Sequence, residues 1–408
     1  MRLLSSILSL FVCVTIAYGQ SNEEVVRKIA DRVIKESVLG FEATDNKKFY
    51  QKASDIPGNV NVKYVSPYTG WHYTHGVLNL SMINLANQLN DPRYFDFAAR
   101  HIEFGFDNYK VFEKRFKHDV KHYAYPYGEL FTMDELDDFG AMSASIIEVY
   151  AKNPKPEYKA YVEKAANHLI NERPRMKDGT FVRAFPREMT LWADDLYMSV
   201  PFLVNMSAMS GDKKYINDAV LQVKNFHKYL WDDNRQIYWH TYYTDLQRNG
   251  IAHWGRCNGW ILLSKIRLLD KLRDNDSRKK EIQNLLEKQI LGLALYQGAD
   301  GLWHQILDKE NSYAESSCTA MFVYGIAHAV NQGWLDKRYG TIAKAGWEGL
   351  KKFKLNELYQ LKDICVGTGI QDNLPFYYNR PVGVNEKHGT GPLIDAGAEI
   401  LKLEKLPK

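Results

Sequence analysis

The stretch Thr190-Leu191-Trp192-Ala193-Asp194-Asp195-Leu196-Tyr197-Met198-Ser199-Val200-Pro201-Phe202 places two aspartates at the start of a strongly apolar segment. A helix that is apolar on nearly all sides is buried, and we therefore expect a buried helix at 195–209. The turn Gly211-Asp212-Lys213-Lys214-Tyr215 follows it, and a charged amphipathic segment continues to residue 230. An amphipathic helix covers a buried one with its apolar face. This part of the chain thus predicts a hairpin of an inner and an outer helix.

The same turn recurs along the chain at intervals of about 60 residues, a period that fits a helix pair with one elaborated loop. The copies share a turn, often with aspartate, followed by a tyrosine and a charged helix. Besides the copy at Tyr215, they are Asp91-Pro92-Arg93-Tyr94, Pro156-Glu157-Tyr158 and Asp336-Lys337-Arg338-Tyr339. A copy without the tyrosine is expected at Asp276-Ser277-Arg278-Lys279-Lys280.

Apolar and charged helices are expected to alternate over the whole chain. The apolar ones fall at 76–87, 139–150, 195–209, 258–272, 318–331 and 392–403, and the charged ones at 22–35, 92–109, 157–171, 213–230, 277–291 and 337–352. Six buried and six covering helices predict an all-α fold, an (α/α)6 barrel of six helical hairpins. An open right-handed solenoid is the alternative. Strand signals, such as 237–243, are short and confined to loops.

The first residues have the pattern of a secretory signal peptide. Met1-Arg2 is charged, 3–17 is apolar, and Ala17-Tyr18-Gly19 offers a small-x-small cleavage site. We therefore expect 1–19 to be removed and 20–408 to form a single exported catalytic domain, in the periplasm or outside the cell. No later apolar run is long enough to span a bilayer.

Composition and net charge limit the kinds of partner that we expect for this protein. The 408 residues are 45% hydrophobic and 25% charged, as in globular proteins, and a net charge of +4 without basic blocks argues against nucleic acid. The mature chain would keep Cys257, Cys318 and Cys365, whose odd number and wide spacing predict neither a disulfide framework nor a metal cluster. We expect no metal and no cofactor, and the sequence predicts no oligomeric state.

Unusual polar and aromatic side chains collect at the starts of the expected inner helices. They are Trp71, Tyr73 and His75; Asp137 and Asp138; Trp192, Asp194 and Asp195; His240, His253, Trp254, Arg256 and Trp260; Trp303, His304 and Glu315; and His388. Inner helices of such a ring run parallel, so these groups would meet in one pocket. Taken singly, each has a structural explanation as a helix cap, a packing residue or a scaffold ion pair. Caps, however, do not require tryptophan, histidine and arginine at every repeat.

Two motifs resemble a known family. Trp192-Ala193-Asp194-Asp195-Leu196-Tyr197-Met198, followed by His253-Trp254-Gly255-Arg256-Cys257-Asn258-Gly259-Trp260, resembles glycoside hydrolase family 105, the unsaturated rhamnogalacturonyl and glucuronyl hydrolases, which are related to family 88. The resemblance extends through His388-Gly389-Thr390-Gly391-Pro392 and covers nearly the whole mature chain. It implies an (α/α)6 barrel, in agreement with the repeat.

The resemblance also implies roles for individual residues. Asp194 matches the general acid/base of the family. Many members have a small residue at the position of Asp195, so we treat Asp195 as a neighbour of the acid. The second acid is Asp138 or Asp137, with a slight preference for Asp138. His240 matches the histidine of the site. The positions that line the sugar site are Trp192, Trp254, Arg256 and Trp260, and we add Trp71, Tyr73, His75, His253 and His388 as candidate substrate contacts.

Family members remove a 4,5-unsaturated uronic acid from the non-reducing end of oligosaccharides released by polysaccharide lyases. The resemblance implies that an aspartate protonates the C4=C5 double bond and helps water to add at C5, after which the glycosidic bond breaks. We expect this acid to hold a proton near neutral pH in a dry pocket.

We expect an anionic unsaturated oligosaccharide as substrate, with rhamnose as the leaving sugar, from rhamnogalacturonan or from the sulfated polysaccharide ulvan. The basic stretches 110–121 and 173–177 either face a sulfate or are solvated surface. Two rival functions share the barrel. One is an epimerase or an ordinary hydrolase, and the other is a sugar-binding protein without turnover.

Overall fold

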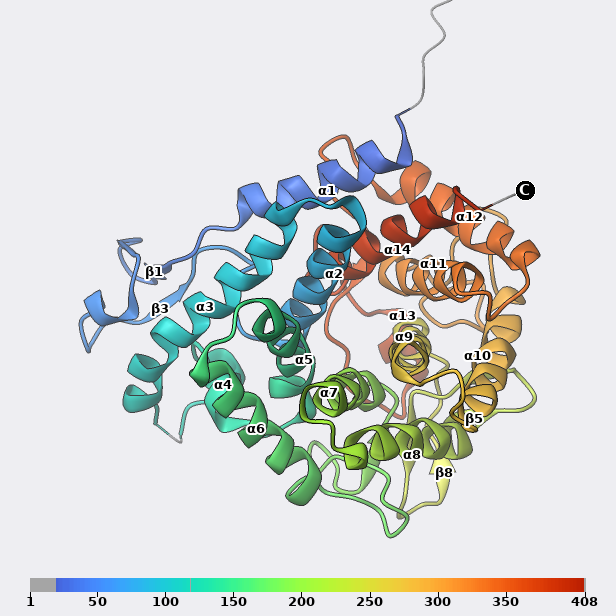
Figure 1. Ribbon diagram of the computed structural model, residues 1–408, viewed down its shortest axis with the longest axis horizontal. Helices are drawn as coiled ribbons and strands as arrows, with labels where there is room; N and C mark the ends of the chain where they lie inside the picture. Colours follow the sequence, from blue (N-terminus) through green and yellow to red (C-terminus); the bar gives the residue numbers. More distant parts are fainter. Residues whose placement is uncertain (1–19, 118, 407–408) are drawn as a thin grey trace, which may run out of the picture.

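Six apolar helices form the inner ring of the chain, which a computed structural model describes over residues 20–117 and 119–406 (Figure 1). They are α2 (Tyr73–Leu89), α5 (Leu136–Lys152), α7 (Asp195–Ser210), α9 (Gly255–Lys271), α11 (Ser316–Asn331) and α14 (Thr390–Leu403). Each packs against the next, and α14 returns to pack against α2. The ring is therefore closed. The predicted (α/α)6 barrel is confirmed, and the open solenoid is wrong.

Six further helices, which are more polar than the inner ones, cover the ring from outside. They are α1 (Asn22–Glu36), α3 (Pro92–Arg115), α6 (Pro156–Asn171), α8 (Lys213–Leu230), α10 (Lys279–Ala294) and α12 (Gly340–Gly349). The recurring turn explains how they begin, since Asp91 and Asp212 accept hydrogen bonds from backbone amides two residues on and cap α3 and α8. The tyrosine of the turn packs inward: Tyr94 and Tyr158 are fully buried. The recurring turn thus marks the start of an outer helix, and its tyrosine packs that helix against the inner ring.

Glycines let the inner helices approach closely. A Cβ atom at Gly140 would lie 1.6 Å from the Met198 carbonyl oxygen, and one at Gly76 would lie 2.4 Å from the backbone of Ala141. Only a residue without a side chain fits such a contact. In the described part of the chain, no helix is both long and apolar enough to cross a lipid bilayer.

Short strands and helices fill the loops at the ends of the ring. They are β1 (Phe41–Ala43), β2 (Phe49–Tyr50), β3 (Val62–Tyr64), β4 (Thr190–Trp192), β5 (Trp231–Asp232), β6 (Ile237–Tyr238), β7 (Thr241–Tyr243), β8 (Arg248–Asn249), β9 (Ile364–Cys365), β10 (Val382–Gly383), α4 (Gly128–Thr132), α13 (Leu374–Tyr378), and the single turns η1 (Ala53–Asp55), η2 (His122–Ala124), η3 (Lys337–Tyr339) and η4 (Leu350–Lys354). The strand signal at 237–243 corresponds to β6 and β7. The predicted signal peptide, 1–19, lies outside the described residues.

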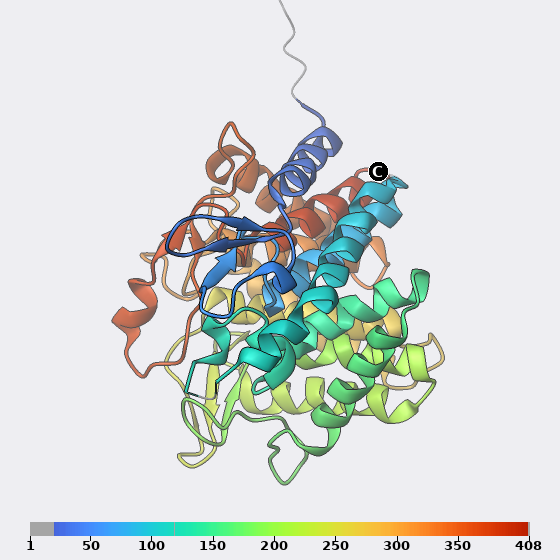
Figure 2. The same cartoon turned by 90° about the vertical axis from the view of Figure 1, so that its left-hand side faces the viewer.

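An antiparallel sheet of order β2-β1-β3 lies between α1 and α2 and was not predicted. Figure 2 shows it on the side of the barrel. Its buried Phe41 packs against Phe104 and Phe112 of α3 and against Tyr127. These aromatic contacts hold the sheet on the outer ring.

Candidate active site

Asp194 and His240 form a buried pair at the start of α7. Strand β4 pairs with β7, and the Ala193 amide donates to the His240 carbonyl, so the two side chains are brought side by side. Asp194 Oδ2 lies 3.1 Å from His240 Nε2, and His240 Nδ1 lies 2.9 Å from the Tyr377 hydroxyl. When the tyrosine hydroxyl donates to Nδ1, the histidine carries its proton on Nε2 and donates it to Asp194. Tyr377, on α13, was not predicted.

The ionisation of Asp194 differs from our expectation. Burial alone would raise the pKa of Asp194, but the hydrogen bond from His240 and the positive charges of Arg183 and Arg256 outweigh burial and lower it. A carboxyl group with a lowered pKa is ionised at neutral pH, so this direction is opposite to the one that we expected.

Arg183 links three of the predicted positions. Its Nε and Nη2 atoms donate to Asp195 at 3.0 and 2.6 Å, and its Nη1 atom lies 3.1 Å from Asp137. Its guanidinium carbon also stands 4.2 Å from the centre of the Trp192 ring. A cation on one face of Trp192 leaves at most the other face for a sugar. The sequence prediction missed Arg183, although an aspartate in place of a small residue at 195 signals a nearby cation.

The structure separates the two candidate acids on α5. Asp138 is 2% exposed, accepts from the Glu135 amide at 3.0 Å and caps the helix, with His122 Nε2 3.3 Å away. Burial raises its pKa above the ordinary value for aspartate. Asp137 is more exposed and points to Arg183. Asp138 thus belongs to the buried helix cap, and Asp137 belongs to the arginine network.

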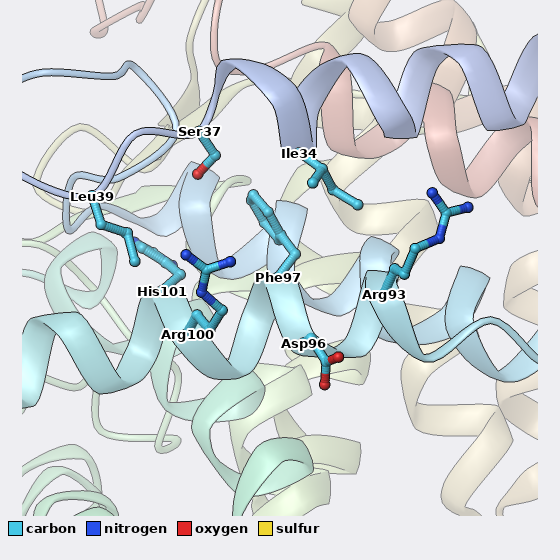
Figure 3. Close-up of a pocket in the computed structure, with 8 residues that line it drawn as sticks. All are labelled: Ile34, Ser37, Leu39, Arg93, Asp96, Phe97, Arg100 and His101. Atoms are coloured by element: carbon cyan, nitrogen blue, oxygen red, sulfur yellow. The ribbon is translucent and has the colours of Figure 1, made fainter.

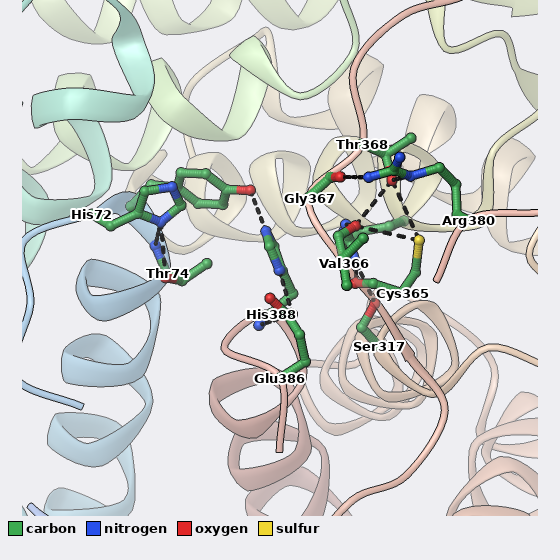
Figure 4. A network of polar contacts seen from close by, with 12 residues as sticks. His72, Thr74, Ser317, Cys365, Val366, Gly367, Thr368, Arg380, Glu386 and His388 are labelled. Atoms are coloured by element: carbon green, nitrogen blue, oxygen red, sulfur yellow. Dashed lines mark hydrogen bonds and ion pairs between the residues drawn. The ribbon is translucent and has the colours of Figure 1, made fainter. Parts of the chain in front are cut away.

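Tyr73 and His388 join the starts of α2 and α14. The Tyr73 hydroxyl lies 2.6 Å from His388 Nε2, and His388 Nδ1 lies 2.5 Å from Glu386 (Figure 4). The ring of Trp260 contacts Tyr73 edge-on and Tyr197 at 4.7 Å. Aromatic side chains from α2, α7 and α9 therefore meet at the end of the barrel that holds Asp194.

Arg256 is committed to the backbone. Its Nη1 and Nη2 atoms donate to the carbonyls of Cys365 and Val366 at 2.5 and 2.7 Å, and its guanidinium stacks on Trp254 at 4.6 Å. It is 1% exposed. Arg256 therefore holds the segment after β9 in place and adds positive charge near Asp194. Both of its terminal nitrogens are occupied, whereas its buried Nε atom has no hydrogen-bond partner among the described residues. Arg380 fastens the same segment through Thr368 and Gly367 (Figure 4).

Three predicted contacts lie in other surroundings. His253 stacks on Trp239 at 3.6 Å and pairs with Asp232 and Asp308. Trp71 is buried among the rings of Phe106, Tyr127 and Tyr161, and His75 binds the Pro67 carbonyl. None of these contacts involves Asp194 or His240.

The basic stretch 173–177 is largely neutralised. Arg173 pairs with Glu135 at 2.9 Å, and Arg175 binds Asp218 through two nitrogens. A small hollow of about 200 Å³ elsewhere on the surface also carries arginines (Figure 3). It lies between α1 and α3 and is lined by Ile34, Ser37, Leu39, Arg93, Asp96, Phe97, Arg100 and His101. None of its lining residues belongs to the predicted site.

One described cluster has metal-ligand chemistry: atoms of His122, Asp134 and Asp138 lie within 4.8 Å of one another. Each ring nitrogen of His122 faces one of the acids, at 3.1 and 3.3 Å. The hydrogen bond with Asp138, opposed by burial, raises the pKa of His122. Both ring nitrogens of His122 are thus directed at carboxylates, which favour the protonated ring.

The chain thus forms a closed ring of helical hairpins with an acid–histidine pair and aromatic rings at one end. The model of Glycosyl Hydrolase Family 88 matches residues 46–404. The chain therefore belongs to this family and is a glycoside hydrolase, as the motifs predicted.

Similar proteins agree with this assignment. The chain is 27% identical over 258 residues to the unsaturated rhamnogalacturonyl hydrolase YesR of Bacillus subtilis, covering 60% of this chain and 72% of that protein. It is 25% identical over 280 residues to an unsaturated 3S-rhamnoglycuronyl hydrolase of Formosa agariphila, covering 65% and 72%.

Solved structures share the fold. A possible family 105 member from Salmonella enterica matches with a TM-score of 0.75 at 22% identity over 93% of both chains. An unsaturated glucuronyl hydrolase from Bacillus sp. GL1 matches with a TM-score of 0.65 at 16% identity, over 94% of this chain and 96% of that one.

Proposed function

We propose that this glycoside hydrolase removes a 4,5-unsaturated uronic acid from the non-reducing end of lyase-generated oligosaccharides. Two relatives support this substrate class, because one is an unsaturated rhamnogalacturonyl hydrolase and the other an unsaturated 3S-rhamnoglycuronyl hydrolase. The buried Asp194–His240 pair, at the end of the barrel where aromatic rings gather, is the observation that carries the proposal.

Asp194 is proposed to transfer the protons. Its carboxyl group gives a proton to C4 of the double bond and then takes one from the water whose oxygen adds to C5. The resulting hemiketal opens to a ketone, and the C1–oxygen bond breaks to release the leaving sugar as an alcohol. Because no carboxylate attacks C1, the separation of two carboxyls does not predict retention or inversion here.

The lowered pKa of Asp194 fits this scheme if substrate binding raises that pKa. A uronate carboxylate bound nearby adds negative charge, and the bound sugar excludes water. Both effects raise the pKa of a carboxyl group. Substrate binding thus loads Asp194 with the proton that it transfers, while His240, held by Tyr377, orients the carboxyl group.

The proposed leaving sugar is rhamnose, in fragments of ulvan or rhamnogalacturonan, and the proposed location is outside the cytoplasm. The signal-like residues 1–19 support export. Since Arg173 and Arg175 are ion-paired, the stretch that contains them offers little support for a sulfate site.

The test is the ultraviolet absorbance of the unsaturated sugar. Purified protein should abolish the absorbance of ulvan-lyase or rhamnogalacturonan-lyase digests, examined side by side. Asp194→Asn should stop the loss, whereas Asp274→Asn, at a fully exposed side chain, should not. Persistent absorbance on both digests contradicts the proposal. Sugar-dependent tryptophan fluorescence without product would favour a binding protein instead.

A further inference from the structure

A second hollow, of about 420 Å³, opens between β3 and the start of α2. Its size is within the range of ligand pockets, about 300–1,000 Å³. Polar and aromatic side chains line it: Lys63, His72, His75, Tyr123, Glu129 and Lys387. The mechanism proposed above uses none of them.

Glu129 is a buried carboxyl group without a protein partner. It is 6% exposed, and among the described residues its side chain makes no hydrogen bond or ion pair; its Oε2 atom is sealed from solvent. His75 is 7% exposed and shows the same feature at Nδ1, since only its Nε2 atom is bonded, to the Pro67 carbonyl at 2.9 Å. Leaving a buried polar group unpaired costs about 1–3 kcal/mol. The other carboxyl oxygen of Glu129, Oε1, is not among the sealed atoms and has no partner among the described residues, so it is the atom open to a ligand in the hollow.

The backbone is strained where it presents Glu129. This residue lies on the five-residue helix α4, and the residues flanking that helix, Tyr127 and Met133, both have left-handed backbones with φ of 59° and 56°. A Cβ atom at Gly128 would stand 2.0 Å from the His122 carbonyl oxygen. Non-glycine residues in this region are unfavourable and cluster at functional sites. The Tyr127 amide is fixed by the Tyr64 hydroxyl at 2.7 Å, so Glu129 is rigidly placed.

The hollow adjoins the end of the barrel that holds the proposed acid. Burial, with the nearby charges of Asp138 and Asp137, raises the pKa of Glu129 well above its ordinary value. A neutral carboxyl group both donates and accepts hydrogen bonds. His72, which Figure 4 labels beside the start of α2, lines the hollow. It precedes Tyr73, whose hydroxyl lies 2.6 Å from His388 Nε2.

We propose that this hollow is the subsite for the leaving sugar, the residue linked to the unsaturated uronate. This proposal rests on the proposed function. Glu129 binds a sugar hydroxyl through Oε1, the carboxyl oxygen that is open to the hollow. Tyr123, 60% exposed on the rim, packs its ring on the C–H face of the sugar. Specificity for a sugar over a simple alcohol thus comes from Glu129 and its hollow.

The test compares two substrates with the same unsaturated uronate, one linked to rhamnose and one linked to methanol. Glu129→Ala should lower kcat/KM for the rhamnoside about tenfold, mainly through KM, and leave the methyl glycoside within about twofold. Glu129→Gln should recover most of the loss, because an amide also donates and accepts. Glu163→Ala, on the outer helix α6, should resemble the wild type with both substrates.

Tyr123→Ala provides a variant at an exposed position that should fold, and it should lower kcat/KM about threefold for the rhamnoside alone. An equal loss with both substrates in Glu129→Ala would overturn the proposal, because Glu129 would then act on the reacting centre through Asp138. No loss with either substrate in Glu129→Ala and Tyr123→Ala would also overturn it. Failure of the wild type on both substrates would instead refute the proposed function.

Discussion

Each end of the barrel buries a histidine next to carboxylates, but the buried charged groups at the two ends differ in how many ion-pair partners they have. At the C-terminal ends of the inner helices, His328 lies 2.9 Å from Asp270 and 3.2 Å from Glu399, and Lys402 binds Glu399 at 2.6 Å. The contact with Glu399 is an ion pair poorly aligned for a hydrogen bond. At the other end, His240 meets one carboxylate, and Glu129 meets none.

The pKa values follow this difference. Although burial opposes the charge on both groups, the acids Asp270 and Glu399 raise the pKa of His328 to about 9, and His328 with Lys402 lowers that of Glu399 to about 2. Around the site, burial raises the pKa of Glu129 and Asp138, whereas at Asp194 it is outweighed by His240 and the nearby arginines. The comparison teaches that complete pairing at one end stabilises the fold, whereas incomplete pairing at the other leaves groups free to react and bind.

The largest expected effect is on the reacting group. Asp194→Asn should reduce kcat about 10³-fold, the range for a lost general acid/base, while changing the free energy of unfolding little. Loss of ultraviolet absorbance measures the first, and urea unfolding the second. A strongly destabilised but active variant would reverse the assignment of the two ends.

His328→Asn should have the opposite effect, a loss of stability with little change in activity. Removing one member of a buried ion pair costs about 3 kcal/mol or more, because Asp270 and Glu399 lose their partner. We expect a lower urea midpoint with kcat/KM within about twofold of the wild type. Unchanged stability would show that the cluster is not a stabilising one.

Arg183→Lys should affect both stability and activity, each less than the two variants above. A lysine cannot hold Asp195 with two nitrogens while reaching Asp137 and covering Trp192. We expect a loss of about 1–2 kcal/mol in unfolding free energy together with about a tenfold fall in kcat. Arg187→Lys, at a surface pair with Asp245, is the matched control. A change in stability alone would make Arg183 part of the scaffold only.

The smallest effect concerns pH. The raised pKa of His328 means that its stabilisation is fully present below about 6.5 and is lost as the pH rises through about 9. The lowered pKa of Glu399 means that its stabilisation is present above about 4.5 and is lost as the pH falls through about 2. From pH 7 to 9, the wild type should lose about 1–2 kcal/mol more stability than His328→Asn. Parallel pH curves would contradict this linkage.

The barrel could be predicted because its pattern is local and repeated. Apolar runs alternate with capped amphipathic helices, and the buried Tyr94 and Tyr158 mark the joins. The β2-β1-β3 sheet was not predicted, because its strands have two or three residues and are defined by pairings across the loop. Such short strands leave almost no periodicity to detect.

The predicted site residues come from helix starts and from the loops before them. Asp194 lies at the start of α7 and His240 lies between β6 and β7, and the structure brings these two predicted residues together. His253 and Trp254 are adjacent in an extended segment, so their side chains point to opposite sides, and only Trp254 contacts His240. Arg183 and Glu129 lie in loops or a five-residue helix, where no period indicates the direction of a side chain.

The packing of α14 against α2 also determines the order in which the protein can be assembled. Of the six ring helices, α14 is synthesised after the other five and supplies the contact that closes the ring. Tyr377, which holds His240, comes shortly before α14 in the sequence. Neither the barrel nor the acid–histidine pair is therefore complete until synthesis has passed α13 and α14.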